Sequence, residues 1–236
     1  MKTDEVLAFD AVRFDTGSDH VSSVADVSFD LVPGEVLLVK LDDEKEPAPI
    51  LDMALGLLPP NAGHIRFMGK VWPELGAFEA AACRGQIGAV FETSSWLSSL
   101  SVAENVMLRL RHHTLRSDGS IREQAETLAQ LGGLSSLSDL RPDRLRRRHL
   151  RVHEWVRACM GDPKLLLMAC PERDAASDAL THLIDLVERA ASRGTAVMWL
   201  TTSDAVWSHE RLCGARRCSI EQERWISLRG RNNNEA

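Results

Sequence analysis

The chain has 236 residues, of which 44% are hydrophobic and 26% are charged, and its formal net charge is -6 at pH 7. This length and composition allow one large globular domain with a substantial core. The acidic balance argues against binding of nucleic acid or an anionic membrane by the whole surface, but it leaves room for a local basic patch. The five cysteines contain no C-x-x-C pair, so we expect reduced thiols in the cytoplasm.

The sequence predicts no membrane segment. Residues 1–28 mix acidic and single apolar residues, unlike a cleavable signal. The longest apolar runs, such as residues 165–170, are far shorter than the ~20 residues that span a bilayer. We therefore expect a cytoplasmic protein that reaches the inner face of the cell membrane through a partner, without direct insertion.

The first third of the chain predicts strands with one helix. Residues 6–32 alternate apolar and polar positions around a turn-rich TGSDH break, which is typical of antiparallel strands. Residues 36–39 form a short apolar run of the kind found in buried parallel strands, and residues 50–58 place leucines and alanine on one helical face. Residues 63–69 and 86–91 predict further strands, joined by an irregular connector over residues 71–85.

The rest of the chain predicts helices first and then alternation. Ser101 and Glu104 have the spacing of a capping box at the start of a helix. Gly132 and Gly133 are expected to end the next one. Later helices are expected over residues 103–113, 121–131, about 151–160 after a basic run at 141–151, and 177–191. Later strands are expected over residues 164–168, 196–200 and near Arg217 and Ile226.

Alternating strands and helices with a β-rich amino end predict an α/β fold with a parallel-sheet core and an antiparallel β arm. The helices from about 93 to 160 interrupt the alternation and are interpreted as an inserted α-helical subdomain. We expect a single domain over residues 1–230 and a tail at 231–236. The arm would comprise about 5–33 and 63–70, and the core about 34–62, 86–92 and 161–230.

Six segments resemble the nucleotide-binding subunit of ABC transporters over nearly the whole chain. They are PGEVLLV, LDMALGLLPPNAGHIRFMGK, IGAVFE, SLSVAENVMLRL, RACMGDPKLLLMACP and GTAVMWLTTSD. The stretch ENVMLRLRHHTL is most similar to the ATPase subunit of Mla/MCE-type lipid transporters. The resemblance implies an ABC-ATPase-like fold with a RecA-like core, a transmembrane permease as partner, and a homodimer or a heterodimer with an ABC ATPase.

The sequence departs from that family where ATP is handled. A phosphate-binding loop reads G-x-x-x-x-G-K-[ST], whereas this chain reads LDDEKEPA, without the glycines, the lysine or the hydroxyl. These residues are Leu41, Asp42, Asp43, Glu44, Lys45, Glu46, Pro47 and Ala48. Four carboxylates beside one lysine are expected to repel a nucleotide.

Other family positions are also replaced. The Asp and Glu that hold magnesium and polarise water correspond to Ala169 and Cys170. The glutamine after the VF pair corresponds to Glu92, and the switch histidine to Ser203. The signature LSGGQ corresponds to Leu145, Arg146, Arg147, Arg148 and His149. We therefore expect a pseudo-ATPase, not an enzyme, that binds neither ATP nor magnesium tightly.

Two opposite charge runs suggest how such a subunit could associate. Charge runs usually mark solvated surface, but in the family's head-to-tail dimer the acidic run at 42–46 would face the arginines at 146–148. One hypothesis pairs them in a dimer that closes without hydrolysis. A rival sets the arginines against the ATP of an active ABC ATPase partner. A third candidate is a module that binds nucleic acid or a lipid headgroup through residues 141–151, although few aromatics lie near that run.

The resemblance and the lost motifs together favour a structural or coupling subunit of a membrane transporter. In the family, the groove that receives the permease would be lined by segment 92–108, and some of its apolar residues must belong to the core. The candidate anchors are Trp96, Leu97, Leu100, Val102 and Met107. If the permease is of the Mla/MCE kind, the cargo would be phospholipid.

The sequence predicts no metal site. His112 and His113 are adjacent and point to different helical faces. His149 and His153 have i,i+4 spacing, but no nearby Cys or carboxylate completes a ligand set. We interpret the second pair as solvated neighbours of the arginines.

Overall fold

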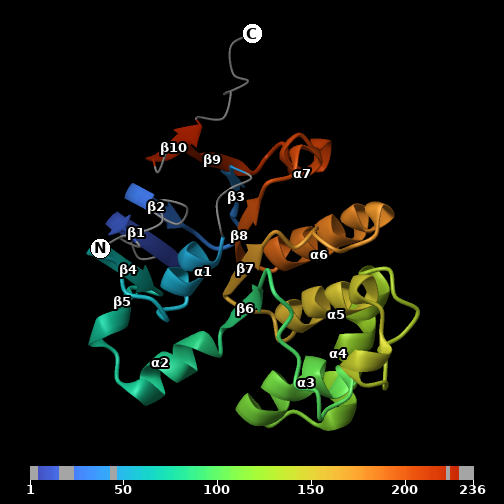
Figure 1. Ribbon diagram of the computed structural model, residues 1–236. Coiled ribbons are helices and arrows are strands. Elements are labelled where there is room, and N and C mark those ends of the chain that lie inside the picture. The colour runs from blue at the N-terminus through green and yellow to red at the C-terminus, as the bar shows by residue number, and fades with distance from the viewer. Residues whose placement is uncertain (1–4, 16–23, 43–46, 222–223, 229–236) are drawn as a thin grey trace.

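Figure 1 shows the computed structural model of the protein, which describes residues 5–15, 24–42, 47–221 and 224–228. Within these residues, ten strands form one sheet in the order β5-β4-β1-β2-β10-β9-β3-β8-β7-β6. The strands are β1 Leu7–Phe14, β2 Val24–Leu31, β3 Val36–Leu41, β4 Ala62–Phe67, β5 Lys70–Val71, β6 Ile87–Val90, β7 Leu165–Ala169, β8 Ala196–Thr201, β9 Arg216–Glu221 and β10 Arg224–Leu228.

The α-helices of the described residues lie between these strands. They are α1 Ala48–Ala54, α2 Ala77–Arg84, α3 Val102–His113, α4 Asp118–Leu131, α5 Arg147–Cys159, α6 Leu180–Ser192 and α7 Asp204–Trp207. Short 3-10 turns occur at Trp72–Glu74, Pro142–Arg144, Ser177–Ala179 and Glu210–Leu212. Helices α3, α4 and α5 pack against one another, and α5 also packs on β6 and α6 (Figure 1).

The sheet joins a parallel half to an antiparallel half. Strands β6, β7, β8, β3 and β9 pair in parallel, whereas β1 pairs antiparallel with β2 and β4, and β4 with β5. Every residue of β7 and β8 is buried, as expected for central strands covered by helices on both faces. The predicted α/β fold with a parallel core and an antiparallel β arm is confirmed.

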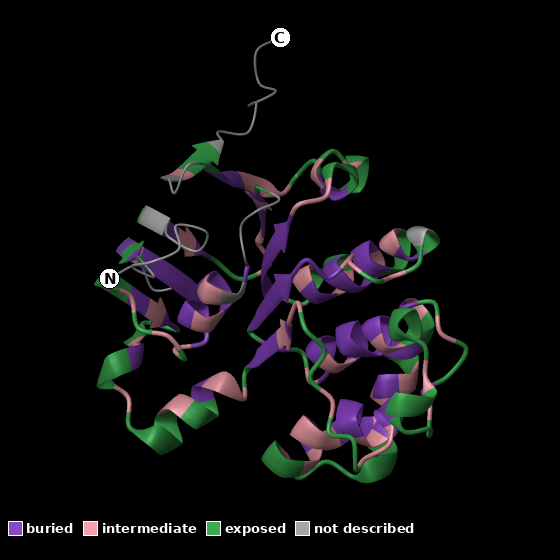
Figure 2. Cartoon of the chain, viewed as in Figure 1, coloured by how far each residue is buried: buried purple, intermediate pink, exposed green. Residues whose placement is uncertain are grey.

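Two hydrophobic clusters cover the two faces of the parallel strands. Successive side chains of a strand point to opposite faces, so Leu37 and Val39 enter one cluster and Leu38 enters the other. The first cluster contains α1 and the β arm, where the Phe29 ring stacks between Phe9 and Trp225 with centroids at 4.7 and 4.9 Å. The second lies under α3 to α6. Figure 2 shows the buried strands between these layers.

Two predicted helix boundaries are confirmed, and one is wrong. Helix α4 ends at Leu131 with Gly132 as its C-cap, as predicted. Ser101 and Glu104 form the predicted capping box at the start of α3, with hydrogen bonds of 3.1 and 2.7 Å. The helix predicted over 50–58 ends instead at Ala54. Gly56 follows with φ of 65°, a left-handed conformation that does not continue a helix, and a Cβ there would lie 2.4 Å from the Trp72 ring, so only glycine fits at this turn.

Helix α2 contradicts the expected irregular connector over residues 71–85. Its segment AFEAAACR is rich in good helix formers, but Cys83 is the buried residue of this helix and Phe78 is 94% exposed. Most of its apolar side chains are exposed, so this helix buries little of its surface against the core. Among the described residues, no helix combines the length and hydropathy needed to cross a membrane.

Gly88 in β6 allows the closest approach between the sheet and α5. A Cβ at this position would lie 1.9 Å from the Ala158 carbonyl oxygen, which is backbone and cannot rotate away. We expect Gly88→Ala to lower the free energy of unfolding by about 3 kcal/mol, measured by urea denaturation.

Gly119→Ala in α4 is the matched control, because no atom outside its chain neighbours and its own helix backbone lies within 4 Å of the added Cβ. We expect this change to leave stability unchanged or raise it by up to about 1 kcal/mol. Equal stability of the two variants would contradict the close contact at Gly88.

Candidate functional site

The carboxyl ends of the parallel strands meet at one edge of the sheet, which is where open α/β sheets bind ligands. Lys40, near the end of β3, donates from Nζ to the Thr202 carbonyl oxygen at 2.7 Å and pairs with Asp204 at 2.6 Å. Both partners follow β8. This contact ties the end of β3 to the segment after β8 and places a cation at the edge.

A second charged group follows β7 at the same edge. Glu172 accepts hydrogen bonds from Trp199 Nε1 at 3.1 Å and from the Thr201 hydroxyl. Arg173 forms an ion pair with Glu92, the predicted counterpart of the family's glutamine, and donates to Thr202 Oγ1 at 3.3 Å. Arg173 therefore connects the segment after β7 to the segment after β6 by an ion pair and to the segment after β8 by a hydrogen bond.

Sequence reasoning missed Lys40, Glu172 and Arg173. They lie one to three positions away from Leu41 and Cys170, so a comparison at fixed motif positions passes over them. The available signal was that charged residues directly beside a buried strand must gather at the sheet edge.

Ala169 and Cys170, which take the family's Asp and Glu positions, are both buried. Cys170 has φ of 42°, in the left-handed region, and its N–H donates to the Leu200 carbonyl oxygen. Burial raises the pKa of its thiol to about 11. The thiol is therefore protonated at neutral pH and is no nucleophile.

The predicted acidic loop is only partly described. Leu41 is buried at the end of β3 and Asp42 is exposed, whereas Asp43, Glu44, Lys45 and Glu46 lie outside the described residues. Pro47 precedes α1, which has no side-chain cap, and Ala48 begins it. Since Pro49 has no N–H, the first turn offers fewer donors to an anion than most helices do.

This edge carries two cations and three carboxylates, and both cations are paired, Lys40 with Asp204 and Arg173 with Glu92. Lys40 and Arg173 supply positive charge for phosphates, and Glu92 and Glu172 supply carboxylates. Across the described ranges, no three His, Cys, Asp or Glu side chains are grouped to hold a metal ion. Magnesium in such a site would need oxygens from the phosphates and water as well.

Arg151 holds α5 against the ends of β6 and β7. This buried guanidinium donates to the carbonyl oxygens of Phe91, Ala169, Cys170 and Pro171 at 2.7–3.3 Å. It also pairs with Glu154 Oε2 at 2.7 Å. The position of the site's strand ends therefore depends on one side chain of α5.

The arginines of the predicted signature segment lie at the start of α5. Arg146 is the N-cap, and Arg146, Arg147 and Arg148 are exposed, as is His149, while Leu145 is half-buried. The first turn has no acidic residue, and Arg147 pairs with Asp174 at 2.9 Å. Positive charge at a helix amino end is unfavourable, so this end favours an added anion.

Ser203, the counterpart of the switch histidine, caps α7. Its hydroxyl accepts from the Val206 N–H at 3.4 Å, and its own N–H donates to Thr201 Oγ1 at 3.0 Å. Since Thr201 also donates to Glu172, the switch position is connected to the carboxylate at the sheet edge through one hydroxyl.

His153 is not the solvated neighbour of the arginines that the spacing suggested. It is buried, with Nδ1 2.8 Å from the His149 carbonyl oxygen and Nε2 accepting from the Ser138 N–H at 3.3 Å. One nitrogen donates and the other accepts, which requires the neutral ring. Burial lowers its pKa accordingly.

A groove of about 530 Å³ separates the sheet core from the bundle of α3 and α5. Leu97, one of the predicted docking anchors, lines it and is 51% exposed. Trp96 and Leu100 are half-buried, whereas Val102 is buried and Met107 is buried in the second hydrophobic cluster. The last two cannot contact a partner directly because α3 turns them toward the core.

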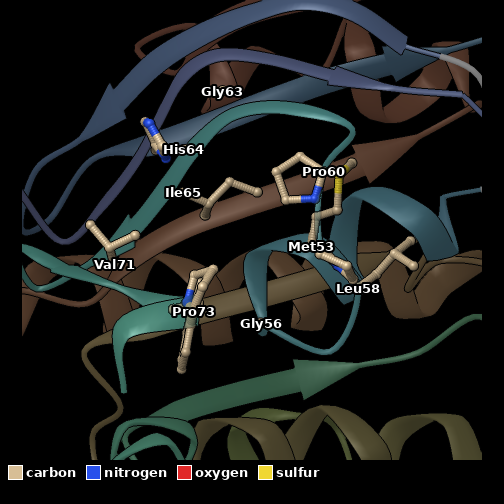
Figure 3. Close-up of a pocket in the computed structure, with 11 residues that line it drawn as sticks. Met53, Gly56, Leu58, Pro60, Gly63, His64, Ile65, Val71 and Pro73 are labelled. Carbon is tan, nitrogen blue, oxygen red and sulfur yellow. The ribbon is translucent and has the colours of Figure 1, made fainter.

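A second cavity, of about 440 Å³, lies between the end of α1, β4 and the turn after β5 (Figure 3). Met53, Ile65 and Pro60 are among its mainly apolar walls. The buried indole Nε1 of Trp72, which also lines it, has no hydrogen-bond partner among the described residues. This cavity is separate from the charged edge of the parallel strands.

No family model matches the chain. It is 28% identical over 221 residues to Nod factor export ATP-binding protein I of Paraburkholderia xenovorans (strain LB400), covering 94% of this chain and 69% of that protein. It is 29% identical over 176 residues to methionine import ATP-binding protein MetN of Photobacterium profundum, covering 74% of this chain and 50% of that protein. The chain thus spans about two thirds of the first relative and half of the second.

The fold matches solved ATP-binding cassettes. A dimeric, post-hydrolysis state of the cassette MJ0796 bound to ADP and Pi has a TM-score of 0.81 at 19% identity, covering 95% of this chain and 99% of that one. An ATP-binding subunit of an ABC transporter has a TM-score of 0.78 at 16% identity, covering 94% and 90%. These likenesses establish the ABC-ATPase-like fold.

The comparisons contradict two sequence expectations, namely that the chain is not an enzyme and that ATP and magnesium are not its cofactors. The relatives are named as ATP-binding proteins, and a structure with the same fold holds ADP and Pi. The expectations rested on side chains at fixed motif positions. Phosphate can also be held by backbone N–H groups and by charges that neighbouring positions bring to the same edge.

Arg151→Met tests how much the contacts of Arg151 with the ends of β6 and β7 stabilise the fold. It would leave Glu154 as an unpaired buried charge and several carbonyl oxygens without a donor, so we expect the free energy of unfolding to fall by about 3–5 kcal/mol. Arg148→Met, an exposed position on the same helix, should change it by less than about 0.5 kcal/mol. Urea denaturation measures both, and similar small losses would contradict the role of Arg151.

The neutral His153 gives a pH dependence. Because its pKa is lowered in the folded state from the ordinary 6.5, the unfolded chain binds the proton more readily. Its contribution to stability is complete above that value and is lost as the pH falls below it. Between about pH 7.5 and about pH 5.5, we expect the wild type to lose about 1 kcal/mol more than His153→Gln. Equal losses in denaturant titrations would contradict the buried neutral ring.

Proposed function

We propose that the chain, whose sequence and fold support the ABC transporter ATP-binding (nucleotide-binding) domain family, is the ATP-binding subunit of a membrane transporter. The observation that carries the proposal is the charged edge of the parallel strands. Lys40 from the end of β3 and the neighbouring residues Glu172 and Arg173 from the segment after β7 gather there, in contact with Thr201 and Thr202 at the end of β8. In open α/β sheets this edge is the usual ligand site.

Each charged residue has a role in this proposal. Lys40 and Arg173 would neutralise phosphate oxygens, and Glu172 and Glu92 would orient the water shell of magnesium. Bound nucleotide with magnesium would supply the free energy that such transporters use. The ion pairs Lys40–Asp204 and Arg173–Glu92 hold these side chains in place when no ligand competes for them.

The groove between the sheet core and the bundle of α3 and α5 is the proposed docking site for a transmembrane permease. Leu57 and Leu97 both line it and are 58% and 51% exposed, so two large apolar side chains are available to a partner in one groove. Trp96 and Leu100 would extend the contact. The chain would then lie on the inner face of the membrane through its partner. The similarity of ENVMLRLRHHTL to Mla/MCE subunits supports phospholipid as the first cargo to test.

The arginines at the start of α5 are the proposed contact with a second ATP-binding subunit. Arg146 and Arg148 are exposed beside helix N–H groups that lack a side-chain cap, and this end favours an anion. In a head-to-tail dimer they would face the phosphates bound by the opposite subunit. That subunit is a second copy of this chain or a related ABC ATPase.

Two measurements on the full chain test the function. A tagged chain purified from its own membranes should bring down permease subunits, identified by mass spectrometry. The purified chain should bind a fluorescent ATP analogue with magnesium, and Lys40→Gln and Arg173→Gln should each weaken binding about tenfold.

Lys70→Gln is the control for that binding assay. Lys70 lies in β5, away from this edge, and forms an exposed ion pair with Glu79 of α2. It should bind as the wild type does. Absence of saturable nucleotide binding, with the fold intact by circular dichroism, would overturn the proposed role of the edge. Absence of any copurified permease would overturn the proposed transporter role.

A further inference from the structure

The cavity at the end of α1 has the size and composition of a small-molecule site. Its volume is about 440 Å³, within the range of roughly 300–1,000 Å³ that ligand pockets occupy. None of the described residues that line it is Asp, Glu, Lys or Arg. It shares no lining residue with the groove between the sheet core and the bundle of α3 and α5. It is therefore a separate hollow that suits an uncharged molecule.

Three prolines stiffen the walls of this cavity. Pro59 and Pro60 precede β4, and Pro73 lies in the 3-10 turn after β5. Because proline fixes its own φ, these walls lose little conformational freedom when a ligand binds. Figure 3 shows Pro60, Ile65 and Pro73 around the hollow, with the His64 ring at its margin. The cavity is thus largely formed before a ligand enters it.

One polar group of these walls is left without a partner. Trp72 is 7% exposed, and its indole Nε1 has no hydrogen-bond acceptor among the described residues. A buried donor without an acceptor is costly, and nearly all such groups in folded proteins are paired. The cavity therefore prefers an occupant with an oxygen that accepts a hydrogen bond from the indole.

The contacts of the Trp72 ring define which of its edges is left to a ligand. The ring stacks on Phe67 with centroids 5.8 Å apart, and the guanidinium carbon of Arg84 lies 5.9 Å from its centroid. Gly56 lies against Cγ, Cδ2 and Cε3, where an added Cβ would come within 2.4–2.6 Å. These atoms form the long edge of the indole opposite Nε1. The edge that carries the unpaired N–H is therefore the one available to an occupant of the cavity.

We propose that this cavity binds a small, uncharged, mainly apolar molecule with a carbonyl oxygen that accepts a hydrogen bond from Trp72 Nε1. The apolar part of that molecule would contact Met53, Ile65 and Pro73. The inference goes beyond the proposed ATP-binding role, because the cavity is separate from the charged edge and uses no residue of it. A cavity that holds only water is the alternative that the test below distinguishes.

Three probes of similar shape test the polarity of the site on the full chain. The compound 1-indanone has a carbonyl oxygen, indane lacks it, and indane-2-carboxylate carries a charge. Dissociation constants are measured by ligand-observed NMR titration. We expect saturable binding of 1-indanone, and binding of indane-2-carboxylate that is at least about tenfold weaker, because the lining supplies no opposite charge for a buried carboxylate.

Two variants locate the binding in this cavity. Trp72→Phe removes the indole N–H and keeps an aromatic ring beside Phe67. We expect it to weaken binding of 1-indanone about tenfold, since one hydrogen bond to an otherwise unpaired donor is lost, and to change binding of indane by less than about twofold. Val71→Trp puts a larger side chain into the wall and should weaken binding of both neutral probes.

Trp207→Phe is the matched control. Trp207 also has an arginine beside its ring, with the guanidinium carbon of Arg217 at 5.6 Å from the centroid, but it lies in α7 and does not line the cavity. This change should leave binding of all three probes unaltered. Circular dichroism checks the fold of each variant. If Trp72→Phe proves unfolded, Val71→Trp decides the test, and unchanged binding of 1-indanone by that variant would contradict the inference.

Absence of saturable binding of 1-indanone would overturn the inference and leave water as the occupant. Equal losses of 1-indanone and indane binding in Trp72→Phe, or tighter binding of indane-2-carboxylate than of 1-indanone, would also overturn it. These results differ from failure of the proposed function. Binding of the ATP analogue without binding of 1-indanone would remove only the cavity's ligand, and the reverse result would remove only the ATP-binding role.

Discussion

One buried guanidinium sets the geometry on which the candidate site depends. Arg151 brings a charge into the core, which is costly unless hydrogen bonds and an opposite charge compensate for it. Here Glu154 supplies the charge, and four backbone carbonyl oxygens at the ends of β6 and β7 accept the remaining hydrogens. Because a guanidinium is planar and rigid, this set of contacts fixes α5 relative to both strands at once.

Helix α5 consequently connects surfaces that lie apart in the sequence. Its amino end presents exposed arginines, its middle holds the strand ends through Arg151, and its carboxyl end contributes Arg157 to the groove. The close contact of Ala158 with Gly88 keeps the helix on the sheet. A displacement of α5 by a partner at one surface would therefore change the position of the others. This is a physical basis for coupling between the groove and the charged edge.

The charged edge also shows that motif positions alone do not describe the polar groups at the strand ends. Ala169 and Cys170 are buried at the end of β7, so neither faces a ligand. The polar groups of that edge belong to Glu172 and Arg173, which follow the strand, and to Lys40, which precedes the end of β3. A ligand is recognised by the charges that surround it in space, and several sequence positions can supply the same charge.

The sequence by itself determined the α/β class, most strands and the start of α3, because these follow from local patterns: apolar runs, alternation and the Ser101–Glu104 capping box. It did not determine α2, most of whose apolar side chains are exposed, or the early end of α1, where Gly56 turns the chain beside the Trp72 ring. Tertiary structure alone decided which of the predicted surface residues are buried, namely Val102, Met107 and His153. It also decided the contacts of Lys40 with Thr202 and of Arg151 with the strand ends. Local pattern fixes which face of an element is apolar, whereas contacts between residues far apart in the chain exist only once the elements have packed.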